Sequence, residues 1–157
     1  MRGTTEISRY DGPREGLAPL FAEADDSESE IAGYINLGDV FVARENGNVV
    51  GHVQVVETAE SGILEIKSLA VGESRRSQGI GAALVGAALA DCRERGAHTV
   101  VVATAAASIG ALQFYQRQGF RIRRVIRDFY GASRGYRPLM LNGIPLLDEV
   151  ILDIALR

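Results

Sequence analysis

The sequence is poor in the residues that build metal centres and disulfide bonds. Its 157 residues contain one cysteine, Cys92, and two histidines, His52 and His98. A lone cysteine excludes an intramolecular disulfide and a cysteine-based zinc cluster, and the two isolated histidines lack metal-ligand spacing. We therefore expect no bound metal. Cys92 falls on one helical face with Leu84 and Ala88, which predicts a packed rather than a reactive thiol.

A long apolar run and an excess of positive charge are also missing. No segment approaches the roughly 20 apolar residues of a membrane span, and the first ten residues, MRGTTEISRY, lack the apolar stretch of a signal peptide. Seventeen basic against twenty acidic residues give a net charge of −3, whereas nucleic-acid-binding domains are usually basic. These features predict a cytoplasmic protein with no membrane partner, and they disfavour nucleic acid as a partner.

The composition that remains, 46% hydrophobic and 24% charged, is ordinary for a globular protein, and the length predicts a single domain over residues 1–157. Hydrophobic periodicity predicts helices at 13–24, 27–38, 79–95 and 108–119. It predicts strands at 4–10, 40–45, 49–57, 62–71, 98–105, 120–129 and 148–156. The strands come first as a meander and then alternate with helices, so the expected class is α/β with a mixed sheet. The connection from 64–71 to 98–104 should be a right-handed parallel crossover.

The most informative segment is RRSQGIGAALVGAAL, residues 75–89, where two glycines open a helix directly after a strand. A helix N-terminus with bare backbone is suited to phosphate. A dinucleotide fingerprint would need a third glycine where Leu84 stands, and a P-loop would need Gly-Lys-Ser/Thr where Gly86 is followed by alanine. Both of these phosphate-binding motifs are thus excluded.

What remains is the pattern Arg76-x-x-Gly79-x-Gly81, which resembles the acyl-CoA signature of the GNAT (Gcn5-related N-acetyltransferase) superfamily. A second block, SIGALQFYQRQGF at 108–120, follows at the distance typical of that family. The resemblance covers roughly residues 38–129. It implies the GNAT fold: a mixed, mostly antiparallel sheet with a central parallel strand pair splayed around acyl-CoA, flanked by about four helices.

The resemblance also implies where acetyl-CoA binds, as acyl donor. The loop N–H groups would hold the pyrophosphate, helped by the missing side chains of two glycines, and the backbone of the preceding strand would pair with the pantetheine arm. Where the family usually has asparagine, this chain has a serine, which can still cap a helix but weakens any amide contact. The implied cofactor-binding residues are Leu69, Val71, Arg76, Ser77, Gln78, Gly79, Ile80, Gly81, Ala82 and Ser108.

Two residues are candidates for the chemistry. By resemblance, Tyr115 in the second block would be the general acid, because a tyrosine hydroxyl is protonated at neutral pH and can reprotonate a thiolate. Glu65 aligns with a general-base glutamate that some family members have on this strand. Lys67 lies two residues further on and would share its face, so Glu65 is either a base or the partner in an ion pair.

The implied function is acetyl-CoA-dependent N-acetyl transfer to a primary amine by direct attack on the thioester. A small-molecule acceptor is favoured because residues 131–146 are long for a connection and contain an Asn142-Gly143 turn, which predicts a small lid or extra hairpin. Alternatives are a protein N-terminal or lysine acetyltransferase, a tRNA-acetylating toxin, and a sensor domain that binds acyl-CoA without catalysis. A homodimer is compatible with the sequence.

Overall fold

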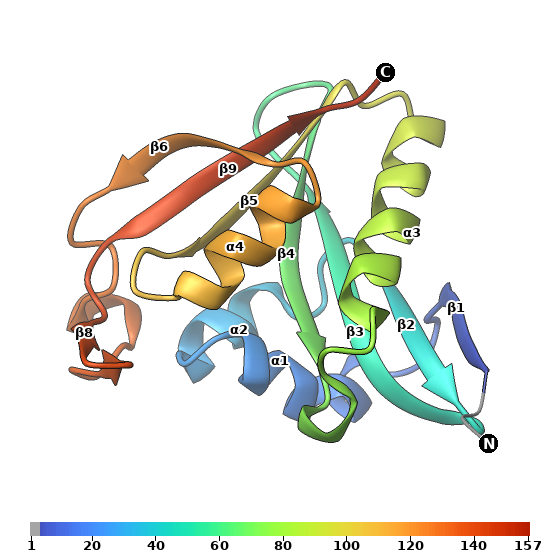
Figure 1. The fold of residues 1–157 in the computed structure, drawn as a ribbon, viewed down its shortest axis with the longest axis horizontal. Helices are drawn as coiled ribbons and strands as arrows, with labels where there is room; N and C mark the ends of the chain where they lie inside the picture. Colours follow the sequence, from blue (N-terminus) through green and yellow to red (C-terminus); the bar gives the residue numbers. More distant parts are fainter. Residues whose placement is uncertain (1–3) are drawn as a thin grey trace.

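The computed structural model describes residues 4–157, so the first three residues of the segment inspected for a signal peptide lie outside it. Within this range, seven strands form one sheet in the order β1-β2-β3-β4-β5-β9-β6 (Figure 1). Only the β4–β5 pair is parallel. The strands are β1 (Thr5–Arg9), β2 (Asp39–Glu45), β3 (Asn48–Glu57), β4 (Ile63–Val71), β5 (Thr99–Ala105), β6 (Arg121–Ile126) and β9 (Glu149–Ala155).

Four α-helices cover the sheet, and they divide its core in two. The helices are α1 (Ala18–Ala24), α2 (Glu28–Tyr34), α3 (Ile80–Glu94) and α4 (Ile109–Arg117). The larger core contains buried residues of α3 and α4 packed on β3, β4, β5 and β9. A separate, smaller core joins α1 and α2 to β2 through Phe21, Tyr34 and Val42. The mixed α/β sheet with its helices confirms the predicted GNAT-type architecture.

The parallel strands β4 and β5 separate part-way along their length. They pair from Ile63–Thr99 to Ile66–Val102, and the last five residues of β4 have no partner on that side. On its other side β4 pairs with β3, but Lys67 has no partner there because Gln54 pairs with Ser68 and Val55 with Ile66. This one-residue bulge stands where the pairing with β5 ends, and a bulge bends the strand that contains it. The predicted splay between the parallel strands is therefore present.

Most of the local signals in the sequence are confirmed. Ser27 caps α2 by accepting from the N–H of Glu30 (3.2 Å), and the predicted extra hairpin is present as β7 (Met140–Leu141) and β8 (Ile144–Pro145). Ser108 stands at the N-cap of α4, but its side chain makes no capping hydrogen bond, so that expectation was wrong. Among residues 4–157, no helix is long and apolar enough to cross a membrane.

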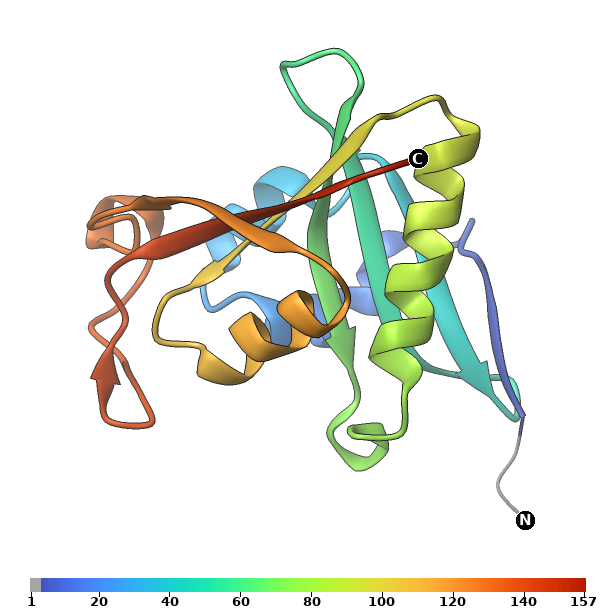
Figure 2. The same cartoon turned by 45° about the horizontal axis from the view of Figure 1, so that its top comes forward.

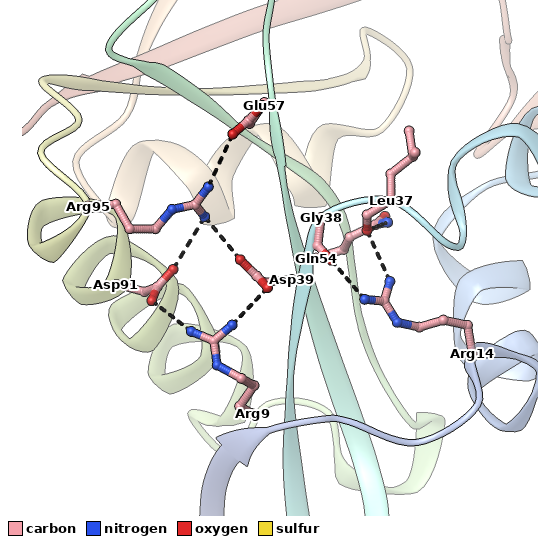
Figure 3. Close-up of polar contacts among 9 residues, drawn as sticks. All are labelled: Arg9, Arg14, Leu37, Gly38, Asp39, Gln54, Glu57, Asp91 and Arg95. Carbon is pink, nitrogen blue, oxygen red and sulfur yellow. Dashed lines mark hydrogen bonds and ion pairs between the residues drawn. The ribbon is translucent and has the colours of Figure 1, made fainter.

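A closed set of ion pairs fastens the outer strands to α3 (Figure 3). Arg9 contacts Asp39 (2.8 Å) and Asp91 (3.2 Å). Arg95 contacts the same two carboxylates (3.3 and 3.5 Å), so two cations and two anions alternate around a ring. Partly exposed pairs of this kind contribute modestly to stability. In this cluster each charge has an opposite partner.

Candidate active site

A groove of about 850 Å³ lies between the β4 edge, the loop before α3 and the first turns of α4. We call it the loop groove. It brings together nine of the ten residues expected to bind the cofactor, and only Gln78 is not among its lining residues. Leu69 and Val71 border it from the part of β4 that has no partner on the β5 side.

The N-terminus of α3 opens into this groove. The first hydrogen bond in the helix is from the N–H of Ala83 to the carbonyl of Gly79 (3.1 Å), so the N–H groups of Ile80, Gly81 and Ala82 have no partner within the helix. Gly79 has a φ of +83°, a left-handed conformation that favours glycine. These three donors and the helix dipole make the end of the groove suited to an anion.

Gly81 has a further reason to be glycine besides the close approach expected for a phosphate group. A Cβ at this position would lie 3.3 Å from the ring of Phe114, which is tighter than an ordinary contact. The missing side chain therefore lets α3 approach Phe114 on α4, and Phe114 itself lines the groove. Gly81 shapes the groove through this aromatic wall.

Both arginines of the loop are already engaged by carboxylates. Arg75 donates to Glu45 at the end of β2 (2.6 Å). Arg76 contacts Glu23 at the end of α1 (2.6 Å) and also donates to the carbonyl of Val71 (3.2 Å). Glu23 and Arg76 thus connect α1 with the loop before α3. Both residues line the groove at partly exposed positions.

Tyr115 lies at the inner end of the loop groove. It is 7% exposed, and its ring packs edge-to-face against Phe114 and Phe120. Burial raises the pKa of its hydroxyl above the ordinary value. None of the side-chain hydrogen bonds found among residues 4–157 involves this hydroxyl, so a protonated donor stands at the groove with its proton uncommitted.

On the other side of the splay is a pocket of about 340 Å³, which we call the acidic pocket. Its walls come from the α1–α2 segment, from β4, β5 and β9, and from the segment between β6 and β9. Four aromatic rings line it: Tyr34, Phe129, Tyr130 and Tyr136. Six carboxylates line it as well, against a single lysine, Lys67: Glu23, Asp25, Asp26, Glu30, Glu65 and Glu149.

Asp25 holds the outer part of the acidic pocket together. It accepts from the hydroxyls of Tyr34 (2.9 Å) and Tyr136 (2.7 Å) and from the N–H of Ser27 (3.0 Å). Tyr136 belongs to the connection that contains the β7–β8 hairpin, so this carboxylate ties that connection to α2. Nearby, Asp26 has a raised pKa, first because of burial and then because of Asp25.

Glu65 on β4 and Glu149 on β9 line the pocket from its sheet side, on strands that flank β5. Burial raises the pKa of Glu65, and Lys67 offsets this only in part. Burial raises the pKa of Glu149 from 4.5 to about 7; Lys67 lowers it, and Glu65 raises it further. The ion-pair alternative for Glu65 is absent among the described residues, because Lys67 instead places its ammonium 5.0 Å from the centroid of the Tyr34 ring.

A smaller cavity of about 220 Å³ lies in the splay and shares residues with both larger ones. It shares Tyr115 with the loop groove, Lys67 with the acidic pocket, and Ser108 and Glu23 with both. The three cavities therefore follow one another through the gap between β4 and β5.

The sequence of this chain is similar to those of known proteins. Residues 14–120 match the Acetyltransferase (GNAT) family. The chain belongs to the GNAT family of acetyltransferases. An uncharacterized N-acetyltransferase of Bacillus subtilis, YvbK, is 32% identical over 141 residues, which is 89% of each chain.

Two solved GNAT-type structures extend the comparison to the whole fold. The IAA acetyltransferase from Bacillus cereus is 32% identical to this GNAT chain, with a TM-score of 0.88 over 98% of this chain and 100% of the other. A GNAT family acetyltransferase from Elizabethkingia anophelis, solved with acetyl-CoA bound, is 27% identical, with a TM-score of 0.88 over 97% of this chain and 98% of the other.

Several residues that line the acidic pocket have no distinct signal in the sequence. Glu149 lies in a predicted strand, Tyr136 lies in the segment predicted as a lid, and Tyr130 falls between that segment and the strand predicted at 120–129. The carboxylates near α2 gave no distinct signal, because acidic residues are common at the start of a helix for their effect on the helix dipole. The signal that could have marked Glu149 is a carboxylate entering an otherwise apolar strand, EVILDIA.

The remaining polar residues have structural roles. His52 is fully buried, contacts the Ser68 hydroxyl (2.7 Å) and packs on Phe21. His98 is partly exposed and contacts the Thr99 hydroxyl. Cys92 is buried in the larger core, as expected for a packed thiol.

Proposed function

We propose that this protein transfers the acetyl group of acetyl-CoA to a primary amine of a small molecule, by direct attack of the amine on the thioester. The observation that carries this proposal is the continuity of the three cavities through the splayed strands. A donor in the loop groove and an acceptor in the acidic pocket would meet at the shared residues Ser108 and Glu23.

The residues of the loop groove fit acetyl-CoA. Its pyrophosphate would accept from the N–H groups of Ile80, Gly81 and Ala82, which have no helical partner. The backbone of Leu69 and Val71, without a partner on the β5 side, would pair with the amide groups of the pantetheine arm. When bound, acetyl-CoA supplies an activated acyl group as a thioester.

The chemistry then needs two proton movements. As the amine nitrogen bonds to the carbonyl carbon and the carbon–sulfur bond breaks, a carboxylate of the acidic pocket accepts the amine proton. Tyr115 donates its hydroxyl proton to the sulfur that leaves. The products are an amide and the free thiol of CoA, and the two protein groups exchange protons with solvent before the next turnover. The uncommitted, protonated hydroxyl of Tyr115 suits this role.

Two carboxylates support the role of base. Glu65 is the sequence candidate, and its raised pKa makes it a stronger base than an exposed glutamate. Glu149 has a pKa of about 7, which matches a general base that works near neutral pH. We assign the base to this pair, with Glu65 contacting the acceptor and Glu149 adjoining it, and the pH profiles of Glu65→Gln and Glu149→Gln separate their contributions.

The shape of the acidic pocket supports a small acceptor. Tyr136, Leu141 and Leu146, from the connection that contains the hairpin, close its outer side. Its volume of about 340 Å³ is at the lower end of small-ligand sites.

A direct test is release of free CoA thiol when the purified protein is mixed with acetyl-CoA and a panel of primary amines. We expect amine-dependent thiol release and a product heavier by one acetyl group in mass spectrometry. Acetyl-CoA binding with no turnover on any amine, peptide N-termini included, would instead support a sensor domain. Turnover confined to peptides would identify a protein acetyltransferase.

A further inference from the structure

The acidic pocket carries far more negative charge than its surroundings neutralise. Of its six carboxylates, only Glu23 forms an ion pair among the described residues, with Arg76. The one lysine of the lining, Lys67, rests over the ring of Tyr34. Five carboxylates thus face the pocket with one ammonium to share, in contrast to the ring of alternating charges around Arg9 and Arg95.

One of these carboxylates is almost entirely enclosed. Glu149 is only 8% exposed, lines the pocket, and forms none of the ion pairs of residues 4–157; one hydrogen bond from Tyr130 and the charges of Lys67 and Arg134 compensate it only in part, because burial still raises its pKa. Removing a carboxylate from water is costly unless a cation or several donors compensate. A bound cation in the pocket would supply that compensation.

The charge is spread along the pocket and not gathered at one point. Glu65 and Glu149 lie on the strands, whereas Asp26 and Glu30 come from the opposite side, where α1 meets α2. Among the described residues, no three carboxylates are arranged to hold a metal ion. Four aromatic rings line the same pocket, and an ammonium binds well beside such rings. This arrangement fits an elongated organic cation better than a point charge.

We propose that the acceptor is a diamine or polyamine. One of its amines is deprotonated at Glu65 and Glu149 and is acetylated, while a second, protonated amine is held by Asp26 and Glu30. This proposal rests on the proposed function, and it adds the charge and length of the substrate. Because the second ammonium is held in one place, only a chain of suitable length brings the other nitrogen to the thioester. The protein would therefore select diamines by chain length.

The test compares linear terminal diamines, from diaminopropane to diaminohexane, with monoamines of equal length at saturating acetyl-CoA. We expect the best diamine to exceed its matched monoamine by at least about tenfold in kcat/KM. The double variant Asp26→Asn, Glu30→Gln should bring this ratio close to one by raising the KM for the diamine. Glu28→Gln is the matched control, because it removes one charge from the same helical turn without lining the pocket.

Calorimetry keeps this proposal separate from the proposed function. With CoA present in place of acetyl-CoA, diaminobutane should bind to the wild type, bind weakly to the double variant, and outcompete butylamine. If diamines bind in this way but no amine is acetylated, the cation site is supported and the proposed transferase activity is refuted. Equal kcat/KM and equal affinity for diamines and monoamines, or a preference that survives in the double variant, would overturn the cation site.

Discussion

The three cavities form one channel, with the loop groove at one end and the acidic pocket at the other. The two ends would recognise their ligands by different means. The loop groove offers backbone: a helix N-terminus, a strand without its neighbour on one side, and a glycine that lets Phe114 approach. The acidic pocket offers side chains drawn from five separate segments of the chain, half of them carboxylates and tyrosines. Backbone recognition depends on a short local motif, whereas side-chain recognition depends on how distant segments meet. The first is therefore visible in a sequence and the second is not.

The two ends also differ in charge. Three arginines, Arg75, Arg76 and Arg117, line the loop groove, and six carboxylates line the acidic pocket. An anionic donor and a cationic acceptor would each be drawn to the end that suits them, and each would be repelled from the other end. Figure 2 shows α3, whose N-terminus opens into the loop groove, on one side of the molecule and the β7–β8 hairpin on the other.

The largest effect on activity is expected at Tyr115, which lines both the loop groove and the smaller cavity in the splay. Tyr115→Phe keeps the ring that packs on Phe114 and Phe120 and removes a hydroxyl that has no partner to abandon. We expect kcat to fall by about 10²–10⁴, with acetyl-CoA affinity and Tm nearly unchanged. Steady-state kinetics and calorimetry measure both. If the variant retains more than about a third of the wild-type kcat, Tyr115 is a packing residue.

Next in size is an effect confined to the groove. Gly81→Val places a branched side chain against Phe114, and we expect acetyl-CoA affinity to fall at least about tenfold. Gly86→Val on the same helix has open space around it and serves as the control. Arg76→Ala should cost less than about threefold, because the side chain is partly exposed and already paired. Equal affinities for wild type and Gly81→Val would separate this glycine from the cofactor site.

A third effect belongs to the acidic pocket and depends on pH. A base must be ionised, so a base with a pKa of about 7 makes wild-type kcat/KM rise as pH increases through 7. Glu149→Gln should remove that rise and lower kcat/KM about tenfold at pH 8. If the rise near pH 7 persists in Glu149→Gln and disappears in Glu65→Gln, the titration belongs to Glu65.

The same substitution should also be visible in stability. The folded protein holds the Glu149 proton more tightly than the unfolded chain, so stability falls as pH rises from 4.5 to about 7. Glu149→Gln should therefore raise the Tm at pH 8 and leave it unchanged at pH 4. An equal shift at both pH values would mean that the titration of Glu149 does not control stability.

The smallest effect tests the outer wall of the pocket. Tyr136→Phe removes one of three donors to Asp25, so we expect the amine KM to rise about threefold while acetyl-CoA affinity holds. Tyr10→Phe is the control, because that hydroxyl bonds only to the carbonyl of Pro13, away from all three cavities. A loss of acetyl-CoA affinity in Tyr136→Phe would show that the two ends are coupled.

The sequence predicted the sheet and the groove because their signals are local. Strand periodicity, the turn at Asn142-Gly143 and the two glycines at the start of α3 each act within a few residues. Glu65 and Tyr115 were found because they lie within the blocks that resemble GNAT proteins. Glu149, Tyr130 and Tyr136 were missed because their roles depend on β9 and its preceding connection folding back beside β5 and α2. The capping prediction at Ser108 failed although its position was right, since the side chain makes none of the expected bonds.

The opening between β4 and β5 depends on one extra residue in β4, Lys67, which has no partner in β3. If Lys67 were deleted, Gln54 would still face Ser68 and Val55 would still face Ile66, but the β3–β4 ladder would run without interruption. Every other side chain of β4 would stay on its present face, whereas the bend would be lost. We expect the straightened strand to continue pairing with β5 beyond Ile66 and Val102, so that the passage would close. A lineage could thus gain or lose the passage by a single-codon insertion or deletion, with no change in the hydrophobic pattern of the strand.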